Sequence, residues 1–407
     1  MSSLSVAAAL RRFLPPFLLR YNIPSRIIDT FKRLSLCHTG KLGWSLIECQ
    51  TCSDLHWTPN GCGDRHCPDC HSRQRELWLK HQRKDLLPVR YYHWVFTVPA
   101  ALRPLFLQNQ KLLYTLLFTA AANTLLEFGL NEFNAHIGLT ALLHTWGQNL
   151  FNHPHLHCLV TGGGLSFDPQ GKPIWVGPKQ SRFLFPVHAV AAMFAAKFIH
   201  GLVELNAQGK LQFHGKLKPF GQPVPWAQLI HSLAQRKWIV FAKGSVVGPD
   251  ALLQYLGRYT HRVAITNSRI LAIDTNTVTF RYKDYAQQGK VRDLVLSGVE
   301  FVRRLSLHIL PPGFTKVRHY GILGNNRRKK SLPLARQALE SSSHRVELSP
   351  VPVPVVLTEH ITCEVCGGVD LSCVGRTDSQ GKFSGLIKGA MRRRLRAGEP
   401  PRVLDTS

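Results

Sequence analysis

Hydrophobic residues occur along the chain in two kinds of segment, and together these predict a mixed α+β fold. Short runs of aromatic and β-branched residues at 91–98, 137–146 and 155–161 are typical of strands. Longer stretches rich in leucine and alanine, at 101–129 and 186–205, indicate helices. Further strands are expected at 238–242, 263–273 and 277–283, and further helices at 223–235, 249–260 and 297–309. Because strands and helices are interleaved, we expect a sheet with helices packed on it.

Changes in composition divide the chain into four regions. Residues 1–36 are expected to form an N-terminal helical arm, and residues 37–75 a small zinc-binding domain that holds six of the ten cysteines. Residues 80–325 carry most of the apolar periodicity and are expected to form the core. Residues 326–407 begin with a basic run and continue through serines and prolines, which is typical of a linker and tail.

The charge balance indicates the class of partner. The chain has 51 lysines and arginines against 24 acidic residues, a formal net charge of +27. Such an excess attracts polyanions, because each neutralised phosphate releases counterions. A membrane-surface protein is the alternative, but no long basic amphipathic helix is apparent. The apolar stretch 112–128 includes Asn123 and Glu127, so we expect a buried helix and no membrane partner. We expect the protein in the cytosol.

Six cysteines lie close together in the region 37–75, in a pattern that predicts Zn²⁺. Two Cys-x2-Cys pairs are separated by 14 residues, which is the spacing of a zinc ribbon: Cys49 with Cys52, and Cys67 with Cys70. A second zinc ion is an open alternative. Its candidate ligands are Cys37, Cys62 and His66, with His38 nearby.

Two other features near these cysteines have weaker interpretations. His56 is expected to be an ordinary surface histidine. The tail contains Cys363, Cys366 and Cys373, with His360 as a conceivable fourth ligand, and this set indicates a partial zinc motif.

Two histidines in the predicted strand 155–161 form a candidate metal clamp. Alternate residues of a strand point to the same side, so His155 and His157 would present two imidazoles on one face. Such a pair alone is more often structural. For a third ligand we favour Gln148, whose carbonyl oxygen suits a hard cation, with His144 and His153 as alternatives.

Two tyrosines give the histidine pair a chemical context. Tyr255 and Tyr259 are four residues apart in a predicted helix, so they lie on one helix face. A phenol with a pKa of about 10 becomes a useful nucleophile where a cation polarises a phosphate. Arg258, His261 and Arg262 would provide a positive setting for DNA.

These motifs together resemble a known family. The segments 153–165 and 255–265, which contain the histidine and tyrosine pairs, are similar to those of the two-tyrosine HUH transposases of bacterial rolling-circle insertion sequences. Arg65 to Cys70 resembles that family's zinc-binding domain, and segments between 301 and 320 resemble its later region. The resemblance covers roughly residues 40–325 and implies an HUH-type antiparallel sheet preceded by a zinc domain.

The resemblance also implies a reaction. His155, His157 and a third ligand would hold Mg²⁺ or Mn²⁺ against a phosphate of a single-stranded element end. One tyrosine would attack to give a 5′-phosphotyrosine and a 3′-hydroxyl, and the second would serve a second cleavage. None of the six Gly-Lys pairs is followed by serine or threonine, so a P-loop is absent from the sequence and a host helicase or replication machinery is an expected partner.

Two other functions remain open at this point. A plasmid replication initiator or relaxase would use the same clamp and tyrosine chemistry. A non-catalytic zinc-ribbon DNA-binding protein would need only the cysteines and the charge. The oligomeric state is not indicated by the sequence.

Overall fold

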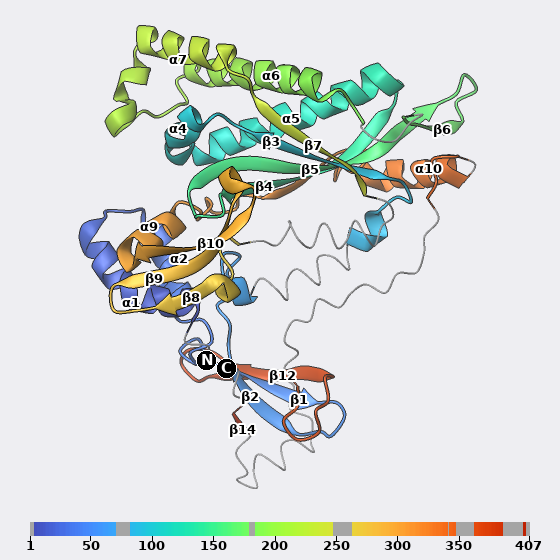
Figure 1. Cartoon of the computed structure of the whole chain (residues 1–407). Helices are drawn as coiled ribbons and strands as arrows, with labels where there is room; N and C mark the ends of the chain where they lie inside the picture. The colour runs from blue at the N-terminus through green and yellow to red at the C-terminus, as the bar shows by residue number, and fades with distance from the viewer. Residues whose placement is uncertain are drawn as a thin grey trace.

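The computed structural model describes residues 4–70, 82–178, 184–246, 263–340, 342–346, 362–385 and 402–403. Within them the elements form three bodies, which Figure 1 shows from top to bottom: a helix-covered sheet, a smaller α+β body, and a small sheet. The mixed α+β class expected from the sequence is confirmed. Short 3-10 turns connect the elements at Arg83–Asp85, Ala100–Leu102, Gly215–Gly221, Asn267–Arg269 and Tyr285–Gln287.

The largest sheet is antiparallel and has six strands. Their order is β11-β4-β5-β3-β7, with β6 paired to β5. The strands are β3 (Tyr91–Thr97), β4 (His136–Trp146), β5 (Asn152–Phe167), β6 (Pro173–Val176), β7 (Ile239–Val246) and β11 (Val317–Gly321).

A layer of helices covers one face of this sheet (Figure 1). The layer comprises α4 (Arg103–Gln108), α5 (Gln110–Phe133), α6 (Val187–Ala207) and α7 (Pro223–Gln235). Phe96 of β3 packs there against Phe194 of α6, and Trp94 packs against Phe185, all of them buried. Burying such side chains contributes roughly 1.5–3 kcal/mol each, so this face is the main apolar core. Both α5 and α6 are long and apolar enough to cross a membrane, a test that core helices also pass.

Two predicted boundaries in this body were wrong. The helix expected over 101–129 is interrupted at Asn109, whose side chain donates to the carbonyl of Gln212 and accepts from its N–H. Strand β5 was expected to stop at Gly162 but continues to Phe167. A Cβ at Gly164 would lie 2.6 Å from the main chain of His136, so glycine here permits close strand pairing and does not end the strand.

The smaller body combines the N-terminal arm with a three-stranded sheet. Helix α1 (Val6–Arg20) packs on α2 (Ser25–Ser35) and on α9 (Gly298–Ser306). The sheet consists of β8 (Ile270–Ile273), β9 (Thr277–Asp284) and β10 (Lys290–Ser297), in the order β10-β9-β8. Its core contains Phe13, Phe17, Phe280 and Phe301. The strand expected from residue 263 therefore starts later, and β10 was not expected.

Helix α10 (Arg328–Glu340) lies where the sequence predicts a linker, so that part of the expectation was wrong. Its apolar residues Leu332, Ala335 and Leu339 are buried against β5 and β6. Only the basic run at its start matched the linker pattern. The helix expected at 249–260 lies outside the described residues.

The small sheet joins two segments that are far apart in the sequence. Its order is β13-β12-β1-β2-β14, from β1 (Trp44–Cys49), β2 (Leu55–Pro59), β12 (Leu371–Thr377), β13 (Phe383–Gly385) and β14 (Arg402–Val403). The zinc-binding region and the tail thus share one sheet (Figure 1).

Candidate active site and cysteine clusters

Three histidines gather on the sheet face opposite the helix layer. His144 comes from β4, and His155 and His157 come from β5. Their ligand nitrogens lie within 4.8 Å of one another, and His144 and His157 are buried. The ring centroids of His155 and His157 are 5.0 Å apart, and those of His144 and His157 are 4.5 Å apart. This is a three-imidazole group that fits a metal ion.

Strand register explains why these side chains meet. His144 pairs directly with His155 across the β4–β5 ladder, and side chains of opposed residues lie on the same face. His157 follows two residues after His155 and returns to that face. Leu156 and Cys158, between and beyond them, are buried in the core on the other side.

Hydrogen bonds fix which nitrogen of each β5 histidine would bind a metal. The Nδ1–H of His155 donates to the carbonyl of His153 at 2.7 Å. The Nδ1 of His157 is hydrogen bonded at 2.8 Å to Nε2 of His93, a buried residue of β3. With Nδ1 engaged in both rings, Nε2 is the nitrogen that would ligate a cation.

Burial keeps two of the imidazoles here neutral. It lowers the pKa of His155 to about 4 and that of His93 to about 3, where the nearby charge of Lys243 acts in the same direction. A neutral imidazole has the lone pair that metal binding requires, so His155 is in its ligand form near neutral pH.

The alternatives considered for the third ligand occupy different places. Gln148, favoured from the sequence, lies in the turn after β4, where its main-chain carbonyl accepts from Arg269. His153 accepts a 3.1 Å hydrogen bond from Arg103 at Nδ1. The structure brings His144 to the histidine pair, and its signal in the sequence was a lone histidine within an apolar strand.

The tyrosines and their basic neighbours cannot be placed. Tyr255, Tyr259, Arg258, His261 and Arg262 all lie outside the described residues.

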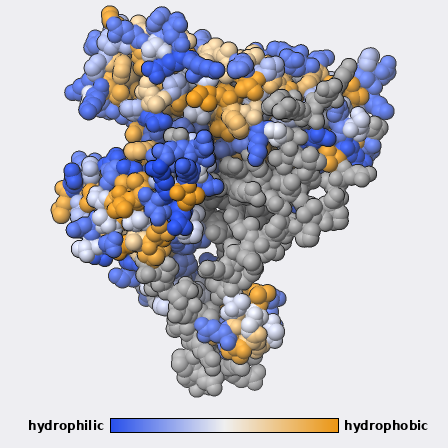
Figure 2. Space-filling view, viewed as in Figure 1, coloured by the Kyte–Doolittle hydropathy of each residue, from blue (hydrophilic) through white to orange (hydrophobic). Residues whose placement is uncertain are grey.

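Apolar side chains are exposed on the same face as the histidines. Val95 of β3 pairs with His157 on one side and with Phe241 of β7 on the other, so Phe241 lies two strands from His157. Phe241 is 56% exposed and Ile239 is 67% exposed. Figure 2 shows apolar side chains on the surface of the upper body around α6 and β7. This edge was not predicted from the sequence.

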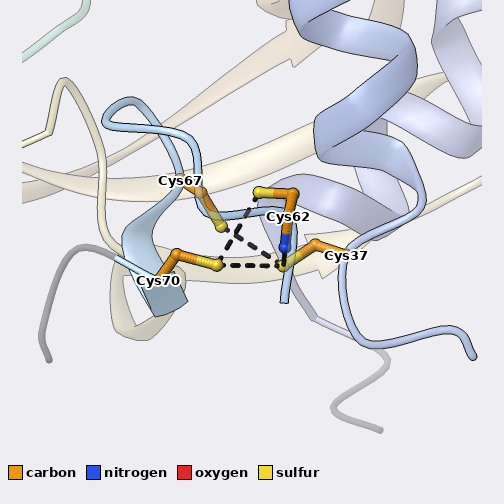
Figure 3. A group of neighbouring side chains, drawn as sticks. All are labelled: Cys37, Cys62, Cys67 and Cys70. Atoms are coloured by element: carbon orange, nitrogen blue, oxygen red, sulfur yellow. Dashed lines mark hydrogen bonds between the residues drawn. The ribbon is translucent and has the colours of Figure 1, made fainter. Parts of the chain in front are cut away.

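The first cysteine cluster contains Cys37, Cys62, Cys67 and Cys70, whose sulfurs point at one another (Figure 3). Cys37 Sγ lies 3.5 Å from the sulfurs of both Cys67 and Cys70. Four thiolates at tetrahedral positions around Zn²⁺ are separated by roughly 3.8 Å, so the cluster fits that ion. Hydrogen bonding to Cys37 lowers the pKa of Cys62 and of Cys70 and raises that of Cys67.

The predicted grouping of the cysteines is corrected by this geometry. Cys49 and Cys52 do not join Cys67 and Cys70, because Cys49 ends β1 of the small sheet whereas Cys67 and Cys70 pack in the smaller α+β body. Cys37 and Cys62, predicted for a second ion, complete the Cys67–Cys70 cluster. His66 stays out of it: its Nδ1 bonds Asp64 at 2.8 Å, and its Nε2 accepts from the Leu310 N–H.

A second cluster contains Cys49, Cys52, Cys363 and Cys366. The partial motif of the tail is therefore completed by the other Cys-x2-Cys pair of the zinc-binding region. His56, expected at the surface, is 0% exposed, and its Nε2 lies 3.3 Å from Cys363 Sγ.

Comparisons with known proteins agree with these features. Residues 138–331 match a family described as "Putative transposase", and residues 9–98 match a "Transposase zinc-binding domain". "Putative transposase y4qJ" of Sinorhizobium fredii is 42% identical over 311 residues, covering 76% of this chain and 77% of that protein. "Transposase for insertion sequence element IS801" of Pseudomonas savastanoi pv. phaseolicola is 27% identical, covering 84% and 82%. No solved structure matches the chain. From the histidine group, the zinc-binding region and these relatives, the chain belongs to the IS91- and IS801-type family of insertion-sequence transposases.

Proposed function

We propose that this transposase cuts and rejoins single-stranded DNA at the ends of its element, through a covalent link to Tyr255 or Tyr259. The observation that supports it is the group of His144, His155 and His157 on the sheet face opposite the helix layer. A bound Mg²⁺ or Mn²⁺ would polarise the scissile phosphate and stabilise its developing charge.

The chain's own residues supply the other requirements. The tyrosine oxygen forms a bond to the phosphorus, which stays attached to the 5′-oxygen, and the bond from phosphorus to the 3′-oxygen breaks. The phenol loses its proton to solvent or a nearby base, and the departing 3′-oxygen gains one. Rejoining reverses these steps on another 3′-hydroxyl, so the phosphodiester energy is conserved and no nucleotide is consumed.

Cations beside the histidines support binding of a DNA backbone. Lys243 of β7 lies opposite His93 in the strand register of β3 and β7, and Arg103 donates a hydrogen bond to His153 at the start of β5. Beyond them the chain as a whole carries +27. Exposed Phe241 and Ile239 on the same face suit unpaired bases more than a duplex, since bases in a duplex are stacked on each other. Strand separation would fall to a host helicase.

The test is covalent capture. Wild-type protein with labelled single-stranded DNA from an element end and Mn²⁺ should give a protein–DNA adduct on denaturing gels. The Tyr255→Phe/Tyr259→Phe double variant should give none, while each single variant should retain some. Equal results for wild type and the double variant would leave a DNA-binding protein without this chemistry.

A further inference from the structure

The second cysteine cluster is assembled from both ends of the described chain. Cys49 Sγ lies 3.6 Å from Cys366 Sγ, and Cys52 Sγ lies 3.5 Å from Cys363 Sγ. These pairs are 317 and 311 residues apart in the sequence. The separations match the roughly 3.8 Å expected between thiolates on one tetrahedral zinc ion. Cys363 and Cys366 lie well outside the matched zinc-binding region, which ends at residue 98.

Hydrogen-bond donors surround the sulfurs of this cluster. The N–H of Gly368 donates to Cys366 Sγ at 3.4 Å. His56 Nε2 lies 3.3 Å from Cys363 Sγ and 3.2 Å from an oxygen of Asp54. A buried imidazole that donates to a ligating sulfur supports the ligand set from outside.

The small sheet has an apolar core that is too small to stabilise it without a metal ion or cross-link. Among the described residues, its apolar core has two buried members, Leu46 and Leu55, with Trp57, Val374 and Phe383 partly buried around them. Main-chain pairing of β1 with β12 adds contacts from Ser45–Arg376 to Cys49–Leu371. Small sheets with so little core depend on a disulfide or a metal for stability.

We infer that Cys49, Cys52, Cys363 and Cys366 bind a second Zn²⁺, which fastens the segment 362–385 to the β1–β2 hairpin. This zinc clasp makes the tail part of the zinc-binding body. It differs from the first cluster in accessibility: Cys366 is exposed, whereas Cys37, Cys62 and Cys67 are buried. A thiol reagent or chelator should therefore remove the clasp ion first.

Zinc content of the full-length protein tests the site. Wild type should contain two equivalents by atomic emission, and Cys363→Ser/Cys366→Ser should contain one. The matched control is Cys373→Ser, because Cys373 is exposed and its sulfur bonds only the carbonyl of Gly375 among the contacts described. The control should keep both ions. Two equivalents in the double variant, or one in wild type, would overturn the proposal.

The fastening role needs a separate readout. With a specific protease site inserted between residues 347 and 361, cleaved wild-type protein should elute as one complex and separate into two fragments after chelation. Fragments that stay together without zinc would show that the sheet, not the ion, holds the tail. Co²⁺ in place of Zn²⁺ gives visible absorption bands at each cysteine site. The double variant should lose the bands of one of the two sites, even if it folds poorly, and bands unchanged from wild type would contradict the proposal. DNA cleavage enters none of these readouts, so a failed clasp and a failed cleavage mechanism are distinguishable.

Discussion

The histidine group and the cysteine clusters place metal ligands in opposite structural settings. The three imidazoles stand on paired strands that are backed by the main apolar core, so their geometry is built before any ion arrives. The cysteines lie on turns around small sheets, and each cluster presents four thiolates. Three ligands leave coordination positions for phosphate oxygens, whereas four thiolates close the shell. The contrast separates a site suited to chemistry from two sites suited to folding.

The strongest test of this contrast removes a histidine ligand. Replacing His155 or His157 with alanine should lower DNA cleavage by at least about a thousandfold, since metal assistance is worth several kcal/mol. Zinc content and thermal stability should remain close to wild type. Cleavage within tenfold of wild type would place the catalytic cation elsewhere.

The hydrogen bond that His157 Nδ1–H donates to His93 Nε2 tests whether the histidine group is built before an ion binds. His93→Ala should raise the Mn²⁺ concentration needed for half-maximal cleavage by about 10- to 100-fold, because the partner of a ligating histidine orients that histidine. His93→Gln, which keeps an acceptor, should recover part of the loss. The measurement is the Mn²⁺ concentration at half-maximal rate; an unchanged value in the alanine variant would assign His93 to packing alone.

Acid should lower the free energy of unfolding through His308. This residue is buried, and its ring is hydrogen bonded to Thr145 of β4 and to the carbonyl of Leu150. Burial lowers its pKa from 6.5 to about 4. Between these values the unfolded chain binds the proton and the folded chain does not, so stability falls as pH drops below 6.5. From pH 7.5 to 5, this residue should cost on the order of 2 kcal/mol of unfolding free energy.

Urea unfolding at both pH values checks this. The His308→Gln variant should lose less stability on acidification than wild type, whatever the cysteine clusters contribute to both. An equal loss of stability in the two proteins would show that His308 does not cause the acid destabilisation.

The smallest effect concerns the exposed edge of the sheet. Phe241→Ser should weaken binding of a single-stranded oligonucleotide about fivefold, corresponding to about 1 kcal/mol of lost base stacking. Phe167→Ser is the matched control, because Phe167 is similarly exposed but lies at the far end of β5. Fluorescence anisotropy gives both affinities, and equal losses would mean that the effect is not specific to the histidine face.

Local patterns in the sequence predicted much of the fold and two of the three histidines in the group. The strand that carries His155 and His157 was predicted from its run of apolar residues, and α7 was predicted at its observed bounds. His144 was only an alternative, because a bulge between His144 and Trp146 shifts the register that brings it opposite His155. Such a shift depends on pairing and not on any one segment.

The cysteine pairing could not be read from spacing. A Cys-x2-Cys turn shows that two thiolates converge, but it does not identify the turn that completes the tetrahedron. Cys49 and Cys52 find theirs more than 300 residues later, across the whole core. Likewise α10 was not predicted, because its basic start resembles a linker. Its apolar residues are buried only through contact with β5 and β6, which the sequence of the segment does not reveal.

The zinc clasp also has a consequence for synthesis on the ribosome. Cys52 leaves the ribosome 311 residues before Cys363, an interval of roughly 15–60 s at usual elongation rates. During that time the six-stranded sheet and its histidines can form, while the β1–β2 hairpin holds only half of the proposed ligand set. The second zinc ion is therefore a late event in biogenesis, and its presence marks a polypeptide that has been translated through Cys366.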